Sequence, residues 1–527
     1  MKCGPKKPMS PSSKLSMHAI GLKIRCDKQA GITHKEQKMN TFFMGVDLGG
    51  TVIKAGIYSP EGQELVVAEC PFPTESPQAG FSERNMDMLW QATCGVIRDA
   101  IHNSRLNPTQ IAGVSFSSHG KGLYLLDKNG KPVRNGIVSS DSRAQNIVDE
   151  WHQNGTAKHA YPLSLQQLWA SHPVSLLRWL KQHEPDNYRD GRYVLMVHDY
   201  IRYRLTDQIT CEETNISGSQ LYNPTTSNYD PKLCQLFGID EVSEKLAPVI
   251  NSAELAGCVT HQAAKACGLV EGTPVFGGFF DVVGAALASG VSQQDKLSAV
   301  AGTWTISTRV FDKIMPADYP YVWGKYCIPG TYFVHEGSPT SASNLAWFTR
   351  HFFNQRLQDY KVLNECVAEG ATRKNDILFF PWLYGSNYHS NLHGGLLGLS
   401  YHHTEADIAY AIYQGIVFSH LLHQDRIVGI DNLTEAIRFT GGPTQSALWM
   451  QMFCDASNLP VEVVDVKQSG CQAAALCAAV GTGYYSGFDT AIASSTPKIT
   501  EYQPNEIAHQ QLRDKFARFK AVADALS

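Results

Sequence analysis

Two short stretches of the chain share one pattern, an apolar strand, a glycine turn and a second strand. The first is VDLGGTVIKAGIY (Val46–Tyr58) and the second is KLSAVAGTWTISTRVF (Lys296–Phe311). In both, apolar residues alternate with polar or small ones on either side of the turn, which is typical of antiparallel strands. The repeat predicts two similar domains, each built around such a strand pair.

The length and composition fit this organisation. The 527 residues are more than one core usually holds, and 43% hydrophobic with 18% charged residues is typical of a soluble globular protein. The sequence contains no apolar run of roughly 18 residues, so it predicts no transmembrane helix. The 13 cysteines are odd in number and form no CxxC pair, which argues against a disulfide framework or a zinc site and favours the reducing cytoplasm.

Residues 1–40 differ from the rest of the chain. They carry nine Lys and Arg residues against Asp27 and Glu36, whereas the remainder is net acidic. This segment predicts a disordered basic leader or tag, with a native start at Met39 or a transit peptide as alternative explanations. The acidic remainder has no charge pattern typical of nucleic-acid binding.

Strand and helix patterns alternate between the two repeats. Met86–Ser104 has apolar residues at helical spacing, and Ile111–Gly120 returns to a strand. The expected fold is therefore α/β with mixed sheets. A boundary near residues 285–296 divides it into an N-terminal domain, 41–290, and a C-terminal domain, 291–527. The Ala- and Gly-rich segment Gly470–Tyr485 predicts close helix packing.

The first glycine turn has the residues for a phosphate site. Backbone amides at Gly49 and Gly50 and the hydroxyl of Thr51 can approach phosphate oxygens, and Asp47 can hold hydrated Mg²⁺. An ordinary hairpin turn is the alternative, since such turns favour glycine.

Two further glycine turns lie in the second half of the chain. Gly302–Thr303 repeats the first turn, and Gly441–Gly442 precedes a helical segment, whose N-terminus favours anions. Taken together, the three turns predict a nucleotide site between the two domains.

A single carboxylate, Asp281, lies in the apolar stretch GGFFDVVGAALASG (Gly277–Gly290). Burying it is costly unless it is paired or hydrogen-bonded. One hypothesis makes it the N-cap of the following helix, and the other makes it a general base. At a helix start the dipole and first-turn amides are expected to keep it ionised.

Two longer segments carry a family resemblance. GGLLGLSYHHTEADIAYAIYQ (Gly394–Gln414) matches one signature of the FGGY carbohydrate kinases in full, and Ser171–His183 matches the other except that Leu176 replaces a usual Lys. With these segments, residues 42–520 resemble that family of the actin/hexokinase/Hsp70 superfamily. Core packing is the expected role of most residues in both segments.

The resemblance implies two ribonuclease-H-like domains with ATP, Mg²⁺ and a sugar in the intervening cleft. It places Asp281 as the catalytic base, which accepts the proton of a sugar hydroxyl during attack on the γ-phosphorus. The implied nucleotide residues are Asp47 (through a water on Mg²⁺), Gly49, Gly50, Thr51, Gly302, Thr303, Gly441, Gly442, Gln445 and Ser446.

Within the family, the sugar segments are similar to those of xylulose kinases. Ser118-His119-Gly120 stands where Met-His-Gly is usual, and Asp141 and Arg143 match a Trp-x-Asp-x-Arg segment in which Ser139 replaces Trp. A strand-end histidine and a turn-forming aspartate are the structural alternatives for His119 and Asp141.

Several segments together are similar to the L-xylulose kinase branch, whose members also act on 3-keto-L-gulonate. Two of them, the polar clusters His335–Asn344 and Tyr384–Asn387, are expected to face the sugar or to satisfy loop backbone.

The resemblance thus implies phosphorylation of a ketopentose, with D-xylulose, ribulose or a sugar alcohol as alternatives to L-xylulose. A non-catalytic regulator on the same fold is the alternative of another class. No membrane or nucleic-acid partner is expected, and the family resemblance favours a cytoplasmic homodimer.

Overall fold

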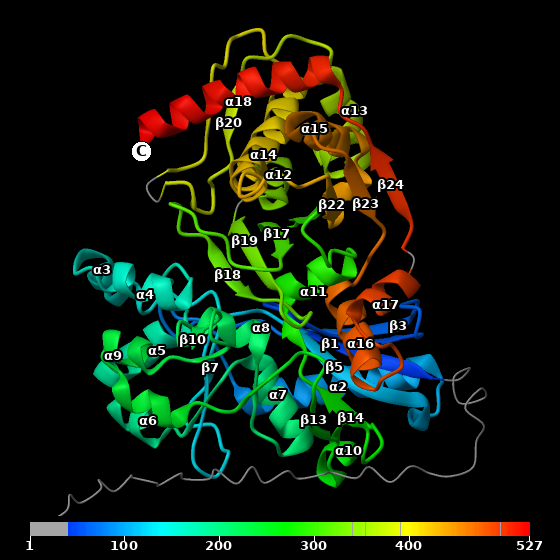
Figure 1. Cartoon of the computed structure of the whole chain (residues 1–527). Coiled ribbons are helices and arrows are strands. Elements are labelled where there is room, and N and C mark those ends of the chain that lie inside the picture. Colours follow the sequence, from blue (N-terminus) through cyan, green and yellow to red (C-terminus); the bar gives the residue numbers. More distant parts are fainter. Residues whose placement is uncertain (1–40, 303, 340, 354, 390–391, 496) are drawn as a thin grey trace, which may run out of the picture. The chain divides into compact units, whose positions relative to one another are not determined.

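The structure is a computed structural model that describes residues 41–527 except 303, 340, 354, 390–391 and 496. The predicted leader and Thr303 lie outside the described residues. Two large sheets organise the described part of the chain (Figure 1).

The first sheet has the strand order β13-β14-β5-β1-β2-β3, with β15 paired to β5. β1 and β2 form the predicted antiparallel hairpin, with Phe43 opposite Tyr58 and Leu48 opposite Ile53. β1 runs parallel to β5. The strands are β1 (Phe42–Leu48), β2 (Val52–Tyr58), β3 (Glu64–Pro71), β5 (Ile111–Ser118), β13 (Leu255–Cys258), β14 (Pro274–Phe276) and β15 (Phe279–Phe280).

The second sheet has the order β18-β19-β17-β16-β22-β23-β24. Its hairpin is β16–β17, and β16 runs parallel to β22. The strands are β16 (Lys296–Ala301), β17 (Thr305–Phe311), β18 (Val322–Lys325), β19 (Tyr332–Ser338), β22 (Ala436–Thr440), β23 (Val461–Val464) and β24 (Ile499–Tyr502).

The same pairing pattern occurs in both sheets. From β3 to β13 the neighbouring pairs are antiparallel, antiparallel, parallel, parallel and antiparallel. From β19 to β24 the sequence of pairings is identical. The predicted duplication of an α/β domain is thus confirmed, and the two glycine turns occupy equivalent positions in the two sheets.

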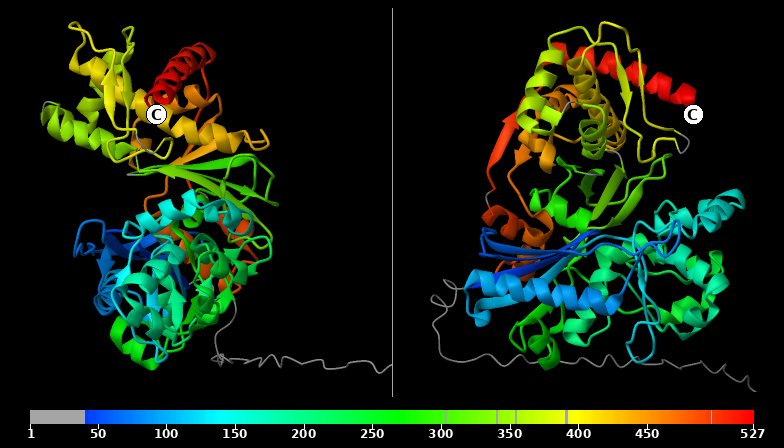
Figure 2. Two further views of the ribbon diagram at one scale, coloured as in Figure 1. Left: turned by 90° about the vertical axis from the view of Figure 1, so that its left-hand side faces the viewer. Right: turned by 180° about the vertical axis from the view of Figure 1, so that it is seen from behind.

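Helices from distant parts of the chain cover the first sheet. α2 (Met86–Ser104), which has the predicted bounds, packs on β2 and β3. α16 (Ser469–Gly481) packs on β1 and β5, although all strands of the second sheet except β24 precede it in the chain. α16 and its neighbour α17 (Phe488–Ser494) lie against the blue strands in Figure 1, and Figure 2 agrees.

The contact between α16 and β1 depends on small residues. A Cβ on Gly45 of β1 would lie 1.9 Å from the carbonyl oxygen of Cys471, a distance that backbone atoms cannot tolerate. On the α16 side, Ala475, Ala478 and Ala479 are buried in the same cluster. The prediction of close packing for this Ala- and Gly-rich segment is confirmed.

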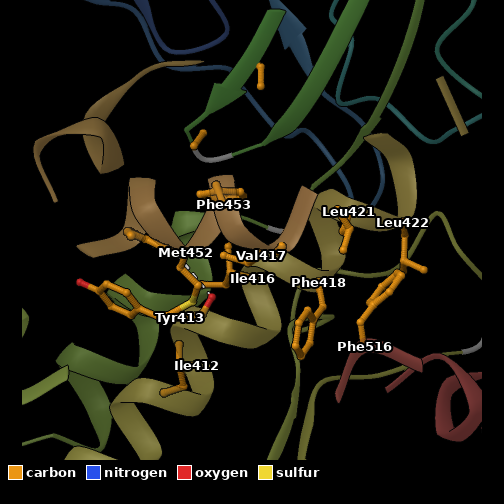
Figure 3. Packing of buried hydrophobic residues seen from close by; sticks show 14 of the residues in the cluster. Ile412, Tyr413, Ile416, Val417, Phe418, Leu421, Leu422, Met452, Phe453 and Phe516 are labelled. Atoms are coloured by element: carbon orange, nitrogen blue, oxygen red, sulfur yellow. Dashed lines mark hydrogen bonds between the residues drawn. The ribbon is translucent and has the colours of Figure 1, made fainter. Parts of the chain in front are cut away.

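The second large core surrounds α14 (Glu405–Val428), which follows a capping box between Thr404 and Asp407. Figure 3 shows α14 side chains, among them Phe418, against Phe453 of α15 (Ala447–Ser457) and Phe516 of α18 (Glu506–Leu526). Burying an aromatic side chain of this size contributes roughly 1.5–3 kcal/mol. The part of the Gly394–Gln414 signature that lies in α14 is mostly buried, as expected, but Leu397–His402 before the helix are exposed, so the expectation of core packing is wrong for that half of the segment.

A third cluster lies in the insertion between β6 and β12 and includes much of the other signature. There α5 (Pro173–His183) buries Leu176 completely, so leucine at this position packs without an unpaired charge. The helices of this region are α3 (Gln145–Gln153), α4 (Thr156–Ser164), α6 (Pro185–Asp190), α7 (Val197–Thr206), α8 (Glu213–Ile216) and α9 (Pro231–Leu236).

The remaining elements are short strands and helices. No described helix has the length and apolarity needed to cross a membrane. The elements are β4 (Glu83–Arg84), β6 (Tyr124–Leu126), β7 (Gly136–Ile137), β8 (Tyr193–Leu195), β9 (Cys211–Glu212), β10 (Tyr222–Asn223), β11 (Asn228–Tyr229), β12 (Val249–Ile250), α10 (His261–Cys267), α11 (Asp281–Ala288), α12 (Ala342–His351), α13 (Tyr360–Ala371), β20 (Leu378–Phe380) and β21 (Gly395–Leu397).

Candidate active site

The first glycine turn joins β1 to β2 at Gly49 and Gly50. The Gly49 amide donates to the carbonyl of Val52 at 3.1 Å, while no atom lies within 4 Å of where a side chain on Gly50 would begin. Gly50 and Thr51 are exposed. The turn therefore offers an open backbone and a hydroxyl to an approaching anion.

A buried arginine, which the sequence analysis did not single out, holds the carbonyl side of this turn. Arg84 donates to the carbonyl oxygens of Gly49 (3.1 Å), Gly50 and Phe72 (3.2 Å). The Arg84 guanidinium is thus occupied by hydrogen bonds to backbone carbonyls. Arg84 therefore holds the turn in place and does not face a ligand. No local pattern around β4 indicates this role.

Asp47 lies near the end of β1, where α16 begins beside it. A Cβ on Gly470 of α16 would lie 2.6 Å from the Asp47 carboxyl carbon, so only glycine leaves room for this side chain. Burial raises the pKa of Asp47 to about 6, and the charge of Lys54 and the nearby Ser117 hydroxyl offset only part of that rise. The Lys54 ammonium instead donates to Gln468 Oε1 at 2.9 Å.

The sheet register brings Asp281 close to Asp47. β5 lies between β1 and β15, and its Ser117 pairs with Asp47 on one side and with Phe279 on the other. Asp281 follows directly after β15, so the two carboxylates flank the same end of β5. Residues 234 positions apart in sequence therefore share one charged site.

Two expectations about Asp281 are wrong. The N-cap position belongs to Phe280, no side chain caps α11, and Asp281 is the first residue of the helix. Burial, followed by the charge of Asp47, raises the pKa of Asp281 to about 7, and these effects outweigh the Val282 amide and Lys121. About half of the carboxyl groups are therefore protonated at pH 7. The free-energy cost of removing the carboxylate from water exceeds the stabilisation that the amides of the first helix turn provide.

Ser118 is completely buried at the end of β5. Its hydroxyl shares a hydrogen bond of 2.7 Å with His198 Nδ1 and accepts one from the Asn215 side chain at 3.1 Å. These partners occupy the hydroxyl inside the protein, so Ser118 anchors the end of the strand and the following His119.

His119 has one ring nitrogen free for a ligand. Nδ1 pairs with the Gly120 carbonyl at 3.2 Å, and among the described residues the buried Nε2 has no partner. Burial, followed by the charge of Arg84, lowers its pKa to about 4, so the ring is neutral near pH 7. Since a carbonyl can only accept, Nδ1 carries the hydrogen, and Nε2 is left as an acceptor for a hydroxyl.

Asp141 and Arg143 form a buried pair, with Arg143 Nη2 2.8 Å from Asp141 Oδ2. Asp141 also accepts from the Ser82 amide at 2.7 Å, and Arg143 donates to Glu83 at 2.7 Å. The Nη1 atom of Arg143 is buried without a partner in the described part of the chain. Because Glu83 and Arg84 are adjacent, this pair is linked to the first glycine turn.

The second and third glycine turns adjoin each other in the second sheet. Gly302 follows β16, Gly441 follows the neighbouring β22, and a Cβ on Gly441 would lie 2.5 Å from the Ala301 carbonyl oxygen. The Gly302 carbonyl accepts from the Ala342 amide at the start of α12 (3.0 Å). Thr303 was also predicted here, but it is not among the described residues.

A short 3₁₀ turn, Gly442–Gln445, separates the third glycine turn from α15. Ser446 is the N-cap of α15 and donates to Asn364 Oδ1 at 2.6 Å, so its hydroxyl has a structural role. Gln445 is exposed beside it. A cavity of about 270 Å³ lies between α12 and residues 357–360.

The predicted residues form three groups. Asp47, Asp281 and His119 gather at the end of β5, Asp141–Arg143 lies behind the first turn, and the third group is the pair of glycine turns in the second sheet. Sequence reasoning missed Lys121 and Gly470, which also belong to the first group. Only the Ala- and Gly-rich composition of α16 indicated that a backbone approaches closely there.

The residues present can hold Mg²⁺ in one way. The described residues contain no group of three His, Cys, Asp or Glu side chains placed to hold a metal. Asp47 offers a hard oxygen next to an open glycine turn. Such a site suits Mg²⁺, which commonly keeps several waters and binds one or two carboxylates together with substrate phosphates.

Comparison with known proteins identifies the family. Residues 42–288 match the N-terminal domain of the FGGY family of carbohydrate kinases, and residues 297–482 match its C-terminal domain. The chain is 43% identical over 489 residues to the L-xylulose/3-keto-L-gulonate kinase of Escherichia coli, covering 93% of this chain and 98% of that protein. It is 40% identical over 486 residues to a probable L-xylulose kinase of Pasteurella multocida, covering 92% and 99%.

Solved structures share the fold. The ligand-bound xylulose kinase of Lactobacillus acidophilus superposes with a TM-score of 0.86 at 20% identity, covering 92% of this chain and 98% of that one. The glycerol kinase of Plasmodium falciparum with ADP gives 0.81 at 16% identity, covering 92% and 98%. The predicted two-domain fold is thus confirmed. The chain belongs to the FGGY family of carbohydrate kinases.

Proposed function

We propose that this kinase transfers the γ-phosphoryl group of ATP to O5 of L-xylulose, giving L-xylulose 5-phosphate and ADP. The printed name of the Escherichia coli relative at 43% identity supports the sugar, and so does that of the Pasteurella multocida relative. ATP as the donor and cysteines that are free thiols throughout the described chain fit a reaction in the reducing cytoplasm.

The observation that carries the proposal is the position of Asp281. It lies beside Asp47 at the end of β5, next to an open glycine turn, and its pKa is raised to about 7. A base whose pKa lies near the working pH combines a useful ionised fraction with a strong pull on the proton.

Asp281 takes the proton of the primary hydroxyl as that oxygen attacks the γ-phosphorus. The new O–P bond forms while the bond between the γ-phosphorus and the β,γ-bridging oxygen breaks, and ADP leaves with the electron pair. The His119 Nε2 acceptor is available to orient another sugar hydroxyl. The amide of Gly50 contacts the phosphates, and the second glycine turn borders them at Gly302, whose own amide donates to the Trp304 carbonyl (3.2 Å). The Gly441–Gly442 turn with Gln445 borders the adenosine.

Asp47 would hold hydrated Mg²⁺ in this proposal, and the ion would supply charge neutralisation on the phosphate oxygens. The protein contributes the fixed position of Asp47, which β1 and the backbone of Gly470 set from opposite sides. Phosphoryl transfer depends mainly on positioning and charge, so these groups suffice.

A panel of purified sugars tests the proposal. The enzyme is assayed for ADP release with L-xylulose, D-xylulose, ribulose and xylitol, and the highest kcat/KM is expected for L-xylulose. Preference for another sugar would overturn the substrate. Binding of sugar in calorimetry without ADP release from any of them would overturn the kinase activity and favour a regulator.

Asp281→Asn tests the base. Turnover is expected to fall by several orders of magnitude, on the order of 10³-fold, while ATP binding persists. Near-normal turnover would refute the assignment.

A further inference from the structure

A lysine next to the predicted sugar loop forms no ion pair with any residue that the structure describes. Lys121 follows His119 and Gly120 at the end of β5 and has a left-handed backbone, with φ of 63°. Its ammonium lies over the Trp169 ring, 3.7 Å from the ring centre. No carboxylate of the described chain forms an ion pair with it, although Asp281 lies near enough to attract its charge.

Histidine nitrogens without partners surround this lysine. Among the described residues, Nε2 of His119, Nε2 of His172 and Nδ1 of His335 are buried and lack a hydrogen-bond partner. His172 directly precedes α5, and His335 on β19 stacks edge-on against Phe280, whose ring centre is 5.7 Å away. Groups from both halves of the chain thus meet around Lys121. Unpaired buried polar atoms of this kind indicate a polar ligand.

The histidines do not add charge to this site. Burial lowers the pKa of His335 to about 3 and that of His172 well below its usual value, and Lys121 lowers both further. Neutral imidazoles bind hydroxyl groups. The nearby arginines already have partners: Arg84 bonds to backbone carbonyls, and Arg143 pairs with Asp141 and Glu83. Within the described residues, Lys121 therefore supplies the uncompensated positive charge.

The printed name of the Escherichia coli relative includes a keto sugar acid beside the neutral ketopentose. We propose that in this chain Lys121 is the residue that determines specificity for such an acid, by binding its carboxylate. This inference rests on the proposed function, because the acid must reach the same base. A sugar acid carries its carboxylate at one end and a primary hydroxyl at the other. Repulsion by Asp281 keeps the carboxylate away from the reacting end, and Lys121 attracts it.

The acid should gain from Lys121 far more than a neutral sugar does. A hydrogen bond between two charged groups is worth roughly 10- to 100-fold in binding. The readout is the ratio of kcat/KM for 3-keto-L-gulonate to that for L-xylulose. This ratio cancels changes that affect both sugars equally, such as the fraction of enzyme in which Asp281 can act as the base.

Lys121→Gln is expected to lower this ratio at least about 10-fold, whereas Lys121→Arg, which keeps the charge, should largely preserve it. The matched control is Lys128→Gln, which changes an exposed lysine on the same segment and should leave the ratio unchanged. A ratio that survives in Lys121→Gln would overturn the proposal.

The pH dependence gives an independent readout. Burial lowers the pKa of Lys121 to about 8, with Asp281 opposing the change, while the neighbouring histidines stay neutral. In the unmodified enzyme the ratio should fall as pH rises through about 8, because the ammonium loses its proton. In Lys121→Gln the ratio should be flat. A ratio independent of pH in the unmodified enzyme would contradict the proposal.

Two further outcomes separate the hypotheses. Turnover of L-xylulose with neither binding nor turnover of the acid would overturn this inference and leave the proposed function intact. If neither sugar is turned over, the proposed function fails. Calorimetric binding of 3-keto-L-gulonate that Lys121→Gln weakens at least about 10-fold would then still support the carboxylate site, and unchanged binding would refute it.

Discussion

The glycine beside Asp47 provides a sharp test of the site. In Gly470→Ala the new Cβ would lie 2.6 Å from the Asp47 carboxyl carbon and 2.7 and 2.8 Å from its two oxygens. Ordinary contacts begin at 3.4 Å, so the carboxylate must retreat by about 0.6 to 0.8 Å. The short Asp47 side chain can rotate to make that room, and so the fold should survive.

The expected effect is on catalysis rather than folding. A displacement approaching 1 Å in a positioning group costs on the order of 10²-fold in rate. We expect kcat to fall by that factor, with a higher Mg²⁺ requirement and little change in the KM for sugar. Gly470 has no left-handed φ, and alanine is favoured over glycine in helices by up to about 1 kcal/mol, so stability should hold or rise.

The assay is ADP release at varied Mg²⁺ and sugar, with urea unfolding measured on the same samples. Gly95→Ala in α2 is the matched control, because no atom lies within 4 Å of its new Cβ. That variant should gain stability without losing activity. Full activity in Gly470→Ala would refute the reasoning that places Asp47 beside the phosphates.

Four other outcomes follow from the structure. Below about pH 7, kcat/KM for L-xylulose should fall tenfold per pH unit, because Asp281 must be ionised to accept a proton, and a flat profile from pH 5.5 to 8 would contradict its raised pKa. Asp281→Asn should melt a few degrees higher than the unmodified enzyme at pH 8, since burial penalises the lost charge, and a lower melting temperature by calorimetry would contradict this. Gly45→Ala should lose at least about 3 kcal/mol in urea unfolding or fail to fold, because its Cβ would lie 1.9 Å from a backbone oxygen, whereas normal stability would mean that α16 can shift. Arg84→Met removes the hydrogen-bond donor that three partly buried or exposed carbonyls share, and it should weaken ATP binding in calorimetry, whereas unchanged binding would mean that the turn holds its shape without the arginine.

The elements set by local sequence were predictable. The helix Met86–Ser104 has the predicted bounds because its apolar residues follow the helical period from end to end. The two hairpins were recognisable because each glycine turn determines its own geometry. The equivalence of the two sheets follows from that repeat.

The chemistry of the site depends on contacts that local sequence does not encode. Asp281 was identified, but its ionisation depends on Asp47, which only the register around β5 brings near. Arg84 bonds to the Gly49 carbonyl, and Gly470 lies against the Asp47 side chain. In both cases the partner is distant in the sequence, so the local pattern does not indicate the contact. The N-cap prediction failed by one residue, since the capping position is decided by the backbone at Phe280.

The path of the chain also bears on how the protein is made. The hairpin of the first sheet is synthesised early, yet its ties to the last quarter of the chain, such as Lys54 to Gln468 and Tyr485 to Pro60, span more than 400 residues. The second sheet likewise needs β24 and α18, which follow residue 498. Neither half can close its core before the ribosome has released residues 469–527. Both halves should therefore reach the native state together, once residues 469–527 have left the ribosome, and a nascent chain stopped short of α16 exposes apolar surface that a chaperone must cover.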